Sequence, residues 1–221
     1  MCSSDLLIET KETYGDERRT EIVEFYSDLT DEDLIPEEDL IVTLSKSGYA
    51  KTQPLDTYQA QNRGGTGKRA ASLKDEDFVS KLFVANTHDT LLCFSSYGKV
   101  YWIKVYRLPR GGRNAKGRPI VNLLPLEKDE RIQAVLPVKE FNDDQFIFMA
   151  TETGSVKKTK LSAYSRPMKS GIKAIKLRDG DRVVNAEITD GTKEIMLFSN
   201  SGKSIRFKES DARPKIGRAH V

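Results

Sequence analysis

One sequence unit recurs four times along this chain, and it constrains the fold more than any single motif does. In each copy, a run rich in apolar and β-branched residues leads into a short turn that ends in glycine, at Gly48, Gly98, Gly154 and Gly202. These glycines lie 50, 56 and 48 residues apart, by subtraction of their positions. Such a period is typical of bladed β structures, because one small sheet buries its faces only against neighbouring sheets. The repeat therefore predicts an all-β array.

Each copy is interpreted as four strands. Two apolar segments flank the glycine and predict a hairpin, as residues 90–94 and 99–106 do in the second copy. A loop rich in Gly, Arg and Lys follows, then a short apolar run (120–124), an acidic turn and a last apolar run (132–136). Four strands per unit is the count of a propeller-type blade. About three complete blades fit between residues 40 and 190, and part of a fourth follows.

Charge is unevenly distributed along the 221 residues. Residues 1–40 hold 3 basic and 14 acidic residues, a balance of −11, whereas residues 41–221 hold 33 basic and 19 acidic residues, a balance of +14. Within the array, the window 95–126 contains 7 basic residues and the window 154–178 contains 8, and neither contains a carboxylate. Both windows cover the second half of a hairpin and the loop after it. If the units stack side by side, these windows form a basic belt suited to a nucleic-acid backbone; ordinary solubilising surface is the alternative.

The densest motif is the glycine-rich loop at residues 61–67, Gln-Asn-Arg-Gly-Gly-Thr-Gly, followed by Lys68 and Arg69. Its glycines permit positive φ and close approach of the backbone, and its cations suit a phosphate. It is not a nucleotide-binding P-loop, because Asn62 and Arg69 stand where that motif has glycine and Ser/Thr. A purely structural turn is the other interpretation. Related loops occupy residues 109–118 and 166–171.

Other site types find little support in the sequence. No apolar run reaches the roughly 20 residues of a membrane span, and Cys93 in an apolar strand is interpreted as a buried small hydrophobe. His88 is interpreted as a turn residue, and the carboxylates at 31–33 and 179–181 as linker or turn elements rather than cation ligands. Aromatic residues near the loops could stack on bases, although packing is the more usual role; they are Tyr49, Tyr101, Trp102 and Tyr106. We predict no catalytic residue, metal site or cofactor in this chain.

The motifs together resemble those of one family. Five of the seven positions in the loop 61–67 match the box Gln-Arg-Arg-Gly-Gly-(Arg/Lys)-Gly that marks the C-terminal domain of the DNA gyrase A subunit, with Asn62 and Thr66 each replacing a basic residue. The resemblance continues through residues 15–22, 84–89, 117–126, 156–159 and 206–210. It covers nearly everything between residues 7 and 214.

The resemblance implies a partial β-pinwheel that wraps double-stranded DNA on its basic rim, in service of ATP-dependent negative supercoiling by an A2B2 enzyme. It implies that residues 7–26 end a helical breakage-reunion region, that 27–39 form an acidic linker and that 40–215 form the pinwheel. The catalytic groups, ATP and Mg²⁺, and the contacts of the gyrase A homodimer with itself and with the B subunits, belong to regions elsewhere in that assembly. A bacterial, nucleoid-associated cytoplasmic location is implied as well, without a membrane.

From the belt and the resemblance together, one set of DNA-binding residues is predicted. They are Gln61, Arg63, Gly64, Gly65, Gly67, Lys68, Arg69, Lys104, Arg107, Arg110, Arg113, Lys116, Arg118, Lys157, Lys158, Lys169 and Arg206.

Two other functions remain open at this stage: the C-terminal domain of a topoisomerase IV A subunit, and a propeller-like scaffold that recruits acidic proteins. Residues 1–6 and 216–221 resemble translated read-through of a sequencing adapter, so they are left out of the functional interpretation.

Overall fold

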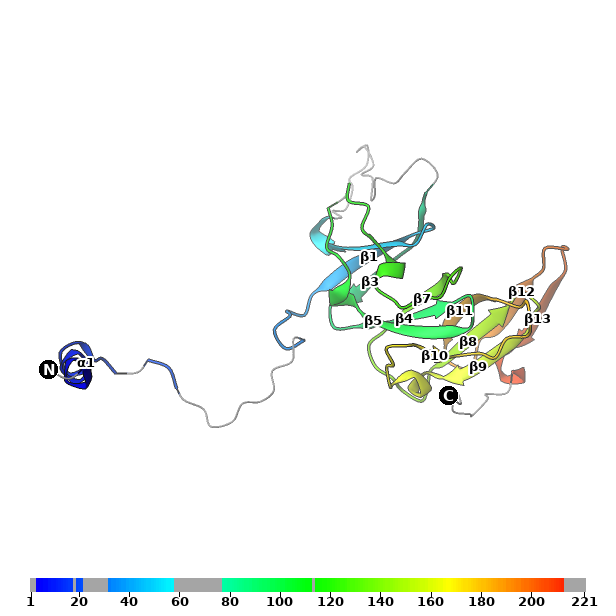
Figure 1. Cartoon of the computed structure of the whole chain (residues 1–221). Coiled ribbons are helices and arrows are strands. Elements are labelled where there is room, and N and C mark those ends of the chain that lie inside the picture. Colours follow the sequence, from blue (N-terminus) through cyan, green and yellow to red (C-terminus); the bar gives the residue numbers. More distant parts are fainter. Residues whose placement is uncertain (1–2, 18, 22–31, 58–76, 113, 213–221) are drawn as a thin grey trace, which may run out of the picture. The chain divides into compact units, whose positions relative to one another are not determined.

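The computed structural model describes residues 3–17, 19–21, 32–57, 77–112 and 114–212. The chain divides into two compact units, residues 1–34 and 35–221. The first contains helix α1 (Ser3–Tyr14) (Figure 1), which begins inside the segment 1–6 and covers only the start of the helical region expected over 7–26. Among the described residues, no helix is long and apolar enough to cross a membrane.

The second unit consists of short strands and single turns of 3-10 helix (Figure 1). The strands are β1 (Asp39–Ser45), β2 (Tyr49–Pro54), β3 (Val79–Asn86), β4 (Thr90–Ser95), β5 (Lys99–Lys104), β6 (Arg118–Pro119), β7 (Ile132–Val138), β8 (Phe146–Thr151), β9 (Val156–Lys160), β10 (Ile172–Lys173), β11 (Val183–Thr189), β12 (Glu194–Phe198) and β13 (Ser204–Lys208). The 3-10 turns are η1 (Leu55–Thr57), η2 (Val105–Arg107), η3 (Ile120–Asn122), η4 (Leu161–Tyr164) and η5 (Glu209–Asp211). The all-β prediction is confirmed.

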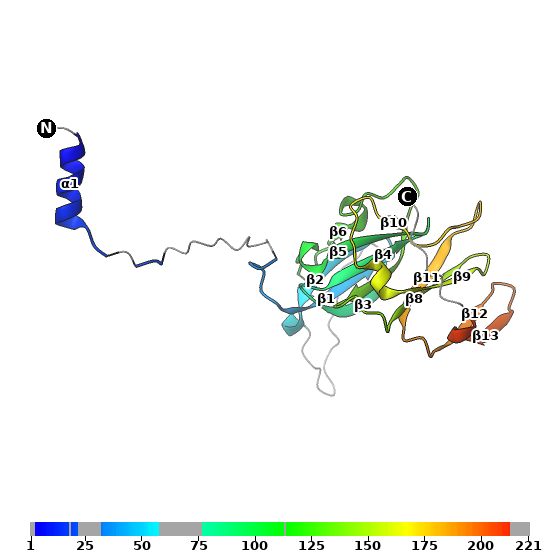
Figure 2. The same cartoon turned by 90° about the horizontal axis from the view of Figure 1, so that it is seen from below.

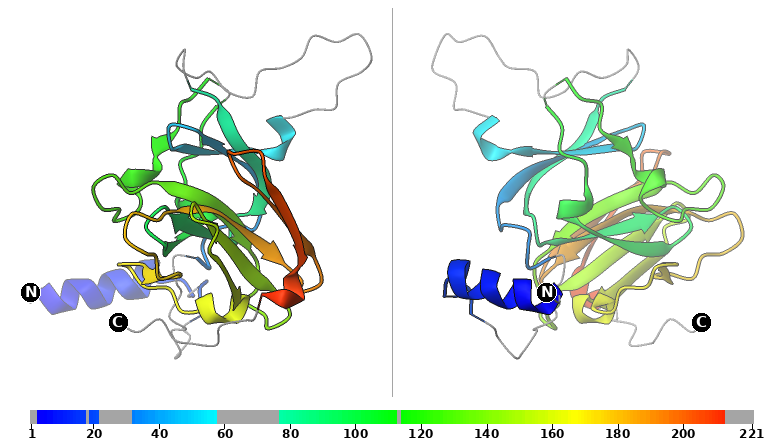
Figure 3. Two further views of the ribbon diagram at one scale, coloured as in Figure 1. Left: turned by 90° about the vertical axis from the view of Figure 1, so that its right-hand side faces the viewer. Right: turned by 60° about the vertical axis from the view of Figure 1, so that its left-hand side comes forward.

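Four sheets follow one another in chain order, as the colours in Figure 3 show. The strand orders are β3-β1-β2-β6, β10-β5-β4-β7, β11-β8-β9 and β12-β13. Each is built on one of the predicted glycine hairpins. The described residues thus give two four-stranded sheets, one of three strands and one of two, where the sequence predicted about three complete units.

The origin of the fourth strand differs from the prediction. The runs 120–124 and 174–177, expected to be strands of their own unit, are not strands; the first begins with η3. The strand lies just before each run and joins the preceding sheet, so β6 pairs with β2 and β10 with β5. The difference arises because a two-residue strand carries no periodic pattern.

The two borrowed strands use the same register. Tyr49 pairs with Pro119, and Lys99 pairs with Lys173. The next residue then donates its N–H to the carbonyl of the turn glycine: Ile120 to Gly48 and Ala174 to Gly98, both at 2.8 Å. The same register at two sites shows that the arrangement is regular: a short strand from one repeat completes the sheet of the preceding repeat, which we call strand exchange.

All four hairpins close with one turn. Gly48, Gly98, Gly154 and Gly202 have φ between 76° and 84°, a region open mainly to glycine. Each glycine N–H donates to the carbonyl three residues earlier at 2.9–3.1 Å. The side-chain hydroxyl of the residue three positions before the glycine accepts a second hydrogen bond, from the backbone N–H of the residue after the glycine, at 3.1–3.2 Å. The residues that carry these hydroxyls are Ser45, Ser95, Thr151 and Ser199.

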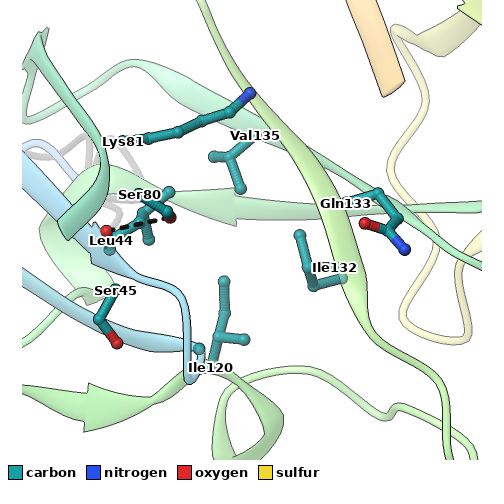
Figure 4. A pocket seen from close by; sticks show the side chains of 9 residues that line it. Leu44, Ser45, Ser80, Lys81, Ile120, Ile132, Gln133 and Val135 are labelled. Atoms are coloured by element: carbon teal, nitrogen blue, oxygen red, sulfur yellow. Dashed lines mark hydrogen bonds between the residues drawn. The ribbon is translucent and has the colours of Figure 1, made fainter. Parts of the chain in front are cut away.

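The core is continuous from sheet to sheet. One buried cluster combines first-sheet residues such as Val42 with second-sheet residues such as Cys93, and another combines Leu92 with third-sheet residues such as Met149. A pocket of about 60 Å³ between the first two sheets is lined by apolar side chains such as Ile120 and Ile132 together with the polar Ser45, Ser80, Lys81 and Gln133 (Figure 4). Its size is far below that of an ordinary ligand site, so it is a packing seam.

Polar contacts hold each interface between neighbouring sheets, here called a seam, at the same position of the repeat. Thr52, Trp102 and Lys158 are each the fourth residue after a turn glycine. The Thr52 N–H donates to Pro109 O (2.9 Å), the Trp102 indole N–H donates to Tyr164 O (2.8 Å), and the Lys158 ammonium pairs with Glu209 (3.1 Å). In every case the partner belongs to the turn or loop after the next hairpin. The stacking of neighbouring sheets is therefore specified by hydrogen bonds as well as by apolar burial.

Candidate nucleic-acid interface

The borrowed strands position two basic loops at sheet edges. β6 and β10 are the outermost strands of the two four-stranded sheets, and both lie toward the same side of the array in Figure 2. The loop before β6 is held along β2, because the Gly111 N–H donates to Thr52 O at 3.0 Å and the Lys51 ammonium donates to Gly112 O at 3.2 Å. Burial lowers the pKa of Lys51, so this lysine is a structural anchor rather than a surface cation.

Both loops expose cations at these edges. Along the described part of the chain, none of these side chains forms an ion pair with a carboxylate; they are Arg107, Lys116 and Arg118 at the first edge, and Arg166, Lys169, Lys173 and Lys176 at the second. Lys173 lies in β10 itself. It was counted in the basic window but not predicted as a site residue, because its place at a sheet edge follows only from the strand exchange.

Several predicted residues are exposed or half-buried but already have partners. The Lys104 ammonium donates to His88 O at 3.0 Å, and the Lys157 ammonium donates to Ala174 O. Arg110 pairs with Glu38. Arg206 on β13 lies 3.8 Å from Glu194. These cations are bound within the protein, and a polyanion must compete for them.

Lys158 does not belong to an exposed interface in this structure. Its side chain is only 5% exposed, its ammonium pairs with the fully buried Glu209 at 3.1 Å, and it lies 4.3 Å from the centre of the Phe146 ring. The sequence prediction of a DNA contact is therefore not supported at this position. Lys158 in β9 lies in the seam between the third and fourth sheets, where it meets Glu209.

The glycine-rich box lies outside the described residues. This applies to seven predicted residues of the box and its flank, and to the isolated Arg113; the seven are Gln61, Arg63, Gly64, Gly65, Gly67, Lys68 and Arg69.

Two of the four aromatic residues near the loops pack inside the array, whereas Tyr49 and Tyr106 are half-buried. Tyr101 is buried, and its hydroxyl donates to the buried Glu130 carboxylate at 3.0 Å; burial is the main cause that raises its pKa. Trp102 is bonded to the next sheet as described above. Among the described residues, these two are therefore packing groups rather than stacking platforms.

Two further predictions concern single residues. Cys93 is fully buried, as predicted, and burial raises the pKa of its thiol to about 12. His88 lies in the β3–β4 turn, as predicted, with its Nε2 2.8 Å from Ile35 O.

Carboxylates at the acidic turns bind the neighbouring hairpin turns. Asp181 accepts from the Thr153 hydroxyl at 2.8 Å and from its N–H at 3.1 Å, and Asp77 accepts from the Ser47 N–H at 3.0 Å. Desolvation alone would raise the pKa of Asp181, but the bonds from Thr151, Thr153 and the backbone outweigh it and lower that pKa. Across the described residues, no group of three or more His, Cys, Asp or Glu side chains could hold a metal.

Sequence reasoning missed the carboxylates that neutralise cations of the basic windows. Glu209 and Glu38 were not expected to have basic partners, although they pair with Lys158 and Arg110. Both lie far from their partners in sequence. The only signal for Glu209 is its position directly after β13, where the second and third copies have the apolar Val105 and Leu161.

Comparison with known proteins agrees with this architecture. The model of the family described as "DNA gyrase C-terminal domain, beta-propeller" matches residues 39–86, 89–139, 145–190 and 193–219. The chain is 58% identical over 210 residues to the DNA gyrase A subunit of Aeromonas salmonicida, an alignment that covers 95% of this chain and 23% of that protein. It spans about a quarter of the length of the curated relatives it matches.

Solved structures agree as well. The C-terminal domain of DNA topoisomerase IV superposes with a TM-score of 0.69 at 32% identity, covering 80% of this chain and 54% of that one. The C-terminal domain of DNA gyrase A superposes with a TM-score of 0.61 at 29% identity, covering 80% and 57%. The resemblance read from the sequence is confirmed: the chain belongs to the DNA gyrase C-terminal domain, beta-propeller family.

Proposed function

We propose that this chain is the DNA-binding and DNA-wrapping region of a gyrase A subunit, and that the basic edges at β6 and β10 contact the phosphate backbone of duplex DNA. The observation that carries the proposal is the repetition of exposed cations, without carboxylate partners among the described residues, at both edge strands. Cations gathered at two equivalent sheet edges favour an extended polyanion over a compact ligand. No base-reading element is required, because backbone contacts carry no sequence information.

In the complete enzyme, the chain would serve ATP-dependent negative supercoiling. ATP, Mg²⁺, the second copy of the gyrase A protein and the two B subunits would act through other regions of an A2B2 assembly. We place the protein in the bacterial cytoplasm, associated with the nucleoid. The support is the family and the bacterial gyrase proteins to which the chain is similar.

Salt dependence of binding tests the DNA contact. The affinity of the chain for a fluorescent duplex is measured by anisotropy from about 50 to 200 mM salt, where a protein with six to ten phosphate contacts loses about three to five decades. The double variant Lys116→Ala/Arg118→Ala should reduce the slope of log K against log salt by about 1.8, that is, about 0.9 per phosphate.

Lys139→Ala is the matched control, because Lys139 is exposed but lies outside both basic windows. Affinity that does not respond to salt, or an equal effect of the control and the double variant, would contradict the proposal.

The corresponding protein of topoisomerase IV is the second candidate, favoured by the TM-score of 0.69 to that domain. The 58% identity to a curated gyrase A subunit favours gyrase, whereas the solved domains, at 32% and 29% identity, do not separate the two candidates. Within its full-length protein, and assembled with the B subunits, the chain should support negative supercoiling of relaxed plasmid. Relaxation alone would select the second candidate.

A further inference from the structure

The end of the acidic segment is fastened to the first sheet. The Thr87 N–H donates to Glu38 O at 2.9 Å, the Glu38 N–H donates to the Thr87 hydroxyl oxygen at 3.1 Å, and that hydroxyl donates to Pro36 O at 2.9 Å. His88 adds its contact with Ile35 O. Apart from the Thr87 hydroxyl and the His88 ring, these bonds use backbone atoms. The course of residues 35–38 therefore does not depend on the Glu38 side chain.

This attachment presents the Glu38 carboxylate to Arg110. The two side chains form an ion pair in which Glu38 is 34% exposed and Arg110 is 56% exposed. Arg110 belongs to the basic loop that leads into β6, and the Thr52 N–H holds that loop through Pro109 O. A carboxylate on one fixed segment thus meets a guanidinium on another, at the edge proposed to contact DNA.

The pair is specific to the first edge. Arg110 and Arg166 both lie 12 residues after a turn glycine, at 98 and 154, yet within the described structure only Arg110 has an acidic partner. Glu38 lies 10 residues before Gly48, and the corresponding residues of the next copies are His88 and Asp144. Asp144 is exposed and has no ion pair with a described residue.

We infer that Glu38 sets the DNA affinity of the first edge by competing with phosphate for Arg110. The inference rests on the proposed function, and it adds an acidic residue that weakens an otherwise basic surface. Phosphate must displace the carboxylate before Arg110 can neutralise a backbone charge. Arg166 has no carboxylate partner to displace, so the two edges differ in their affinity for DNA although their loops occupy equivalent positions.

Four variants measured by duplex anisotropy over a range of salt test this inference. Glu38→Gln keeps the shape of the side chain and removes its charge, so it should tighten binding about two- to fivefold, the range expected for an exposed ion pair. It should also steepen the salt slope by about 0.9, one additional phosphate. In the Arg110→Ala background, the same change should have no effect. Asp144→Asn, an equal change of net charge at the equivalent position, should have less than half the effect.

Melting temperatures of all variants verify that each is folded. Unchanged affinity of Glu38→Gln overturns the inference, as does a gain that persists without Arg110 or that Asp144→Asn reproduces, since either would indicate a general charge effect. In these cases the parent chain still binds DNA, so the proposed function stands. Failure of the parent and every variant to bind duplex overturns both.

Discussion

A buried ion pair joins the third and fourth sheets through single residues. The side chains of Lys158 and Glu209 are 5% and 0% exposed, and Glu209 also accepts from the Thr189 hydroxyl at 2.6 Å. Two charges removed from water contribute little net stability as a pair, but loss of one partner leaves the other unpaired in the interior. This residue pair therefore acts mainly as a constraint on how the fourth hairpin is placed.

Glu209→Gln should lower the free energy of unfolding by about 3–5 kcal/mol, because the Lys158 charge would lose its partner. Urea denaturation followed by circular dichroism measures the change. The double variant Lys158→Met/Glu209→Leu should be clearly more stable than the single one, since apolar groups of similar volume replace the pair. A double variant as unstable as the single one would contradict this account.

Asp181 gives the fold a dependence on acid. Its pKa is lowered in the folded state, so its contribution to stability is present above the unfolded value of about 3.9 and is lost as the pH falls through the folded value. Melting temperatures from pH 7 to pH 2 should show Asp181→Asn below the parent at neutral pH, with the difference closing in acid. Asp179→Asn, an exposed neighbour, should show no such trend; a pH-independent difference for Asp181→Asn would exclude the mechanism.

At the level of elements, the two-residue strands β6 and β10 have consequences beyond their length. Each completes a sheet started by the preceding repeat and brings a basic loop to its edge. The glycine before each strand makes this possible: Gly117 and Gly171 have φ of +82° and +72°. A Cβ at Gly171 would lie 2.6 Å from Cε1 of Tyr101.

Gly171→Ala should therefore destabilise the second sheet by about 1–3 kcal/mol from backbone strain, with a further loss from the Tyr101 contact. Urea denaturation measures the stability, and duplex anisotropy measures the loss of DNA affinity expected when Lys173 is displaced. Gly180→Ala is the control for backbone strain alone, because Gly180 has φ +78° but open space around it. The difference between the two variants therefore gives the cost of the contact with Tyr101. Equal losses in the two variants would show that the contact with Tyr101 is unimportant.

The sequence predicted the hairpins because the glycine, the apolar runs and the spacing are all local features. It also predicted which loops are basic. It could not predict that β6 and β10 join the preceding sheets, because a pair such as Arg118-Pro119 has no periodicity. For the same reason, Lys158 was assigned to the surface: its environment depends on Glu209, 51 positions away by subtraction. Strand partners and seam contacts are long-range properties, whereas hairpins are short-range ones.

At the level of the whole molecule, separation of charge is the dominant property. The array carries +14 over residues 41–221, and the preceding segment carries −11. Among the described residues, both sheet edges expose cations without a carboxylate partner, such as Lys116 and Lys173, whereas carboxylates such as Glu130 and Asp181 are used inside seams and turns. This arrangement concentrates positive potential on the edges without reducing the internal polar bonding of the sheets.

If duplex DNA runs over both edges, the effects of neutralising them should add. Lys116→Ala/Arg118→Ala and Lys169→Ala/Lys173→Ala should each weaken binding, and the combined variant should show the sum of the two changes in log K to within a factor of about two, as for independent sites. Anisotropy at fixed salt measures all three. A combined variant no weaker than the weaker-binding double would mean that only one of the two edges contacts DNA.

Because of strand exchange, the repeat of the sequence and the sheet of the structure do not have the same boundaries. A sheet is not encoded by one continuous stretch, so duplicating or deleting a stretch that ends at a sheet boundary would leave an uncovered edge on its neighbour. During synthesis, the first sheet waits for Arg118-Pro119 to leave the ribosome, after the second hairpin has already emerged. Completion of the first and second sheets therefore lags one repeat behind translation, since each needs a strand from the repeat that follows it.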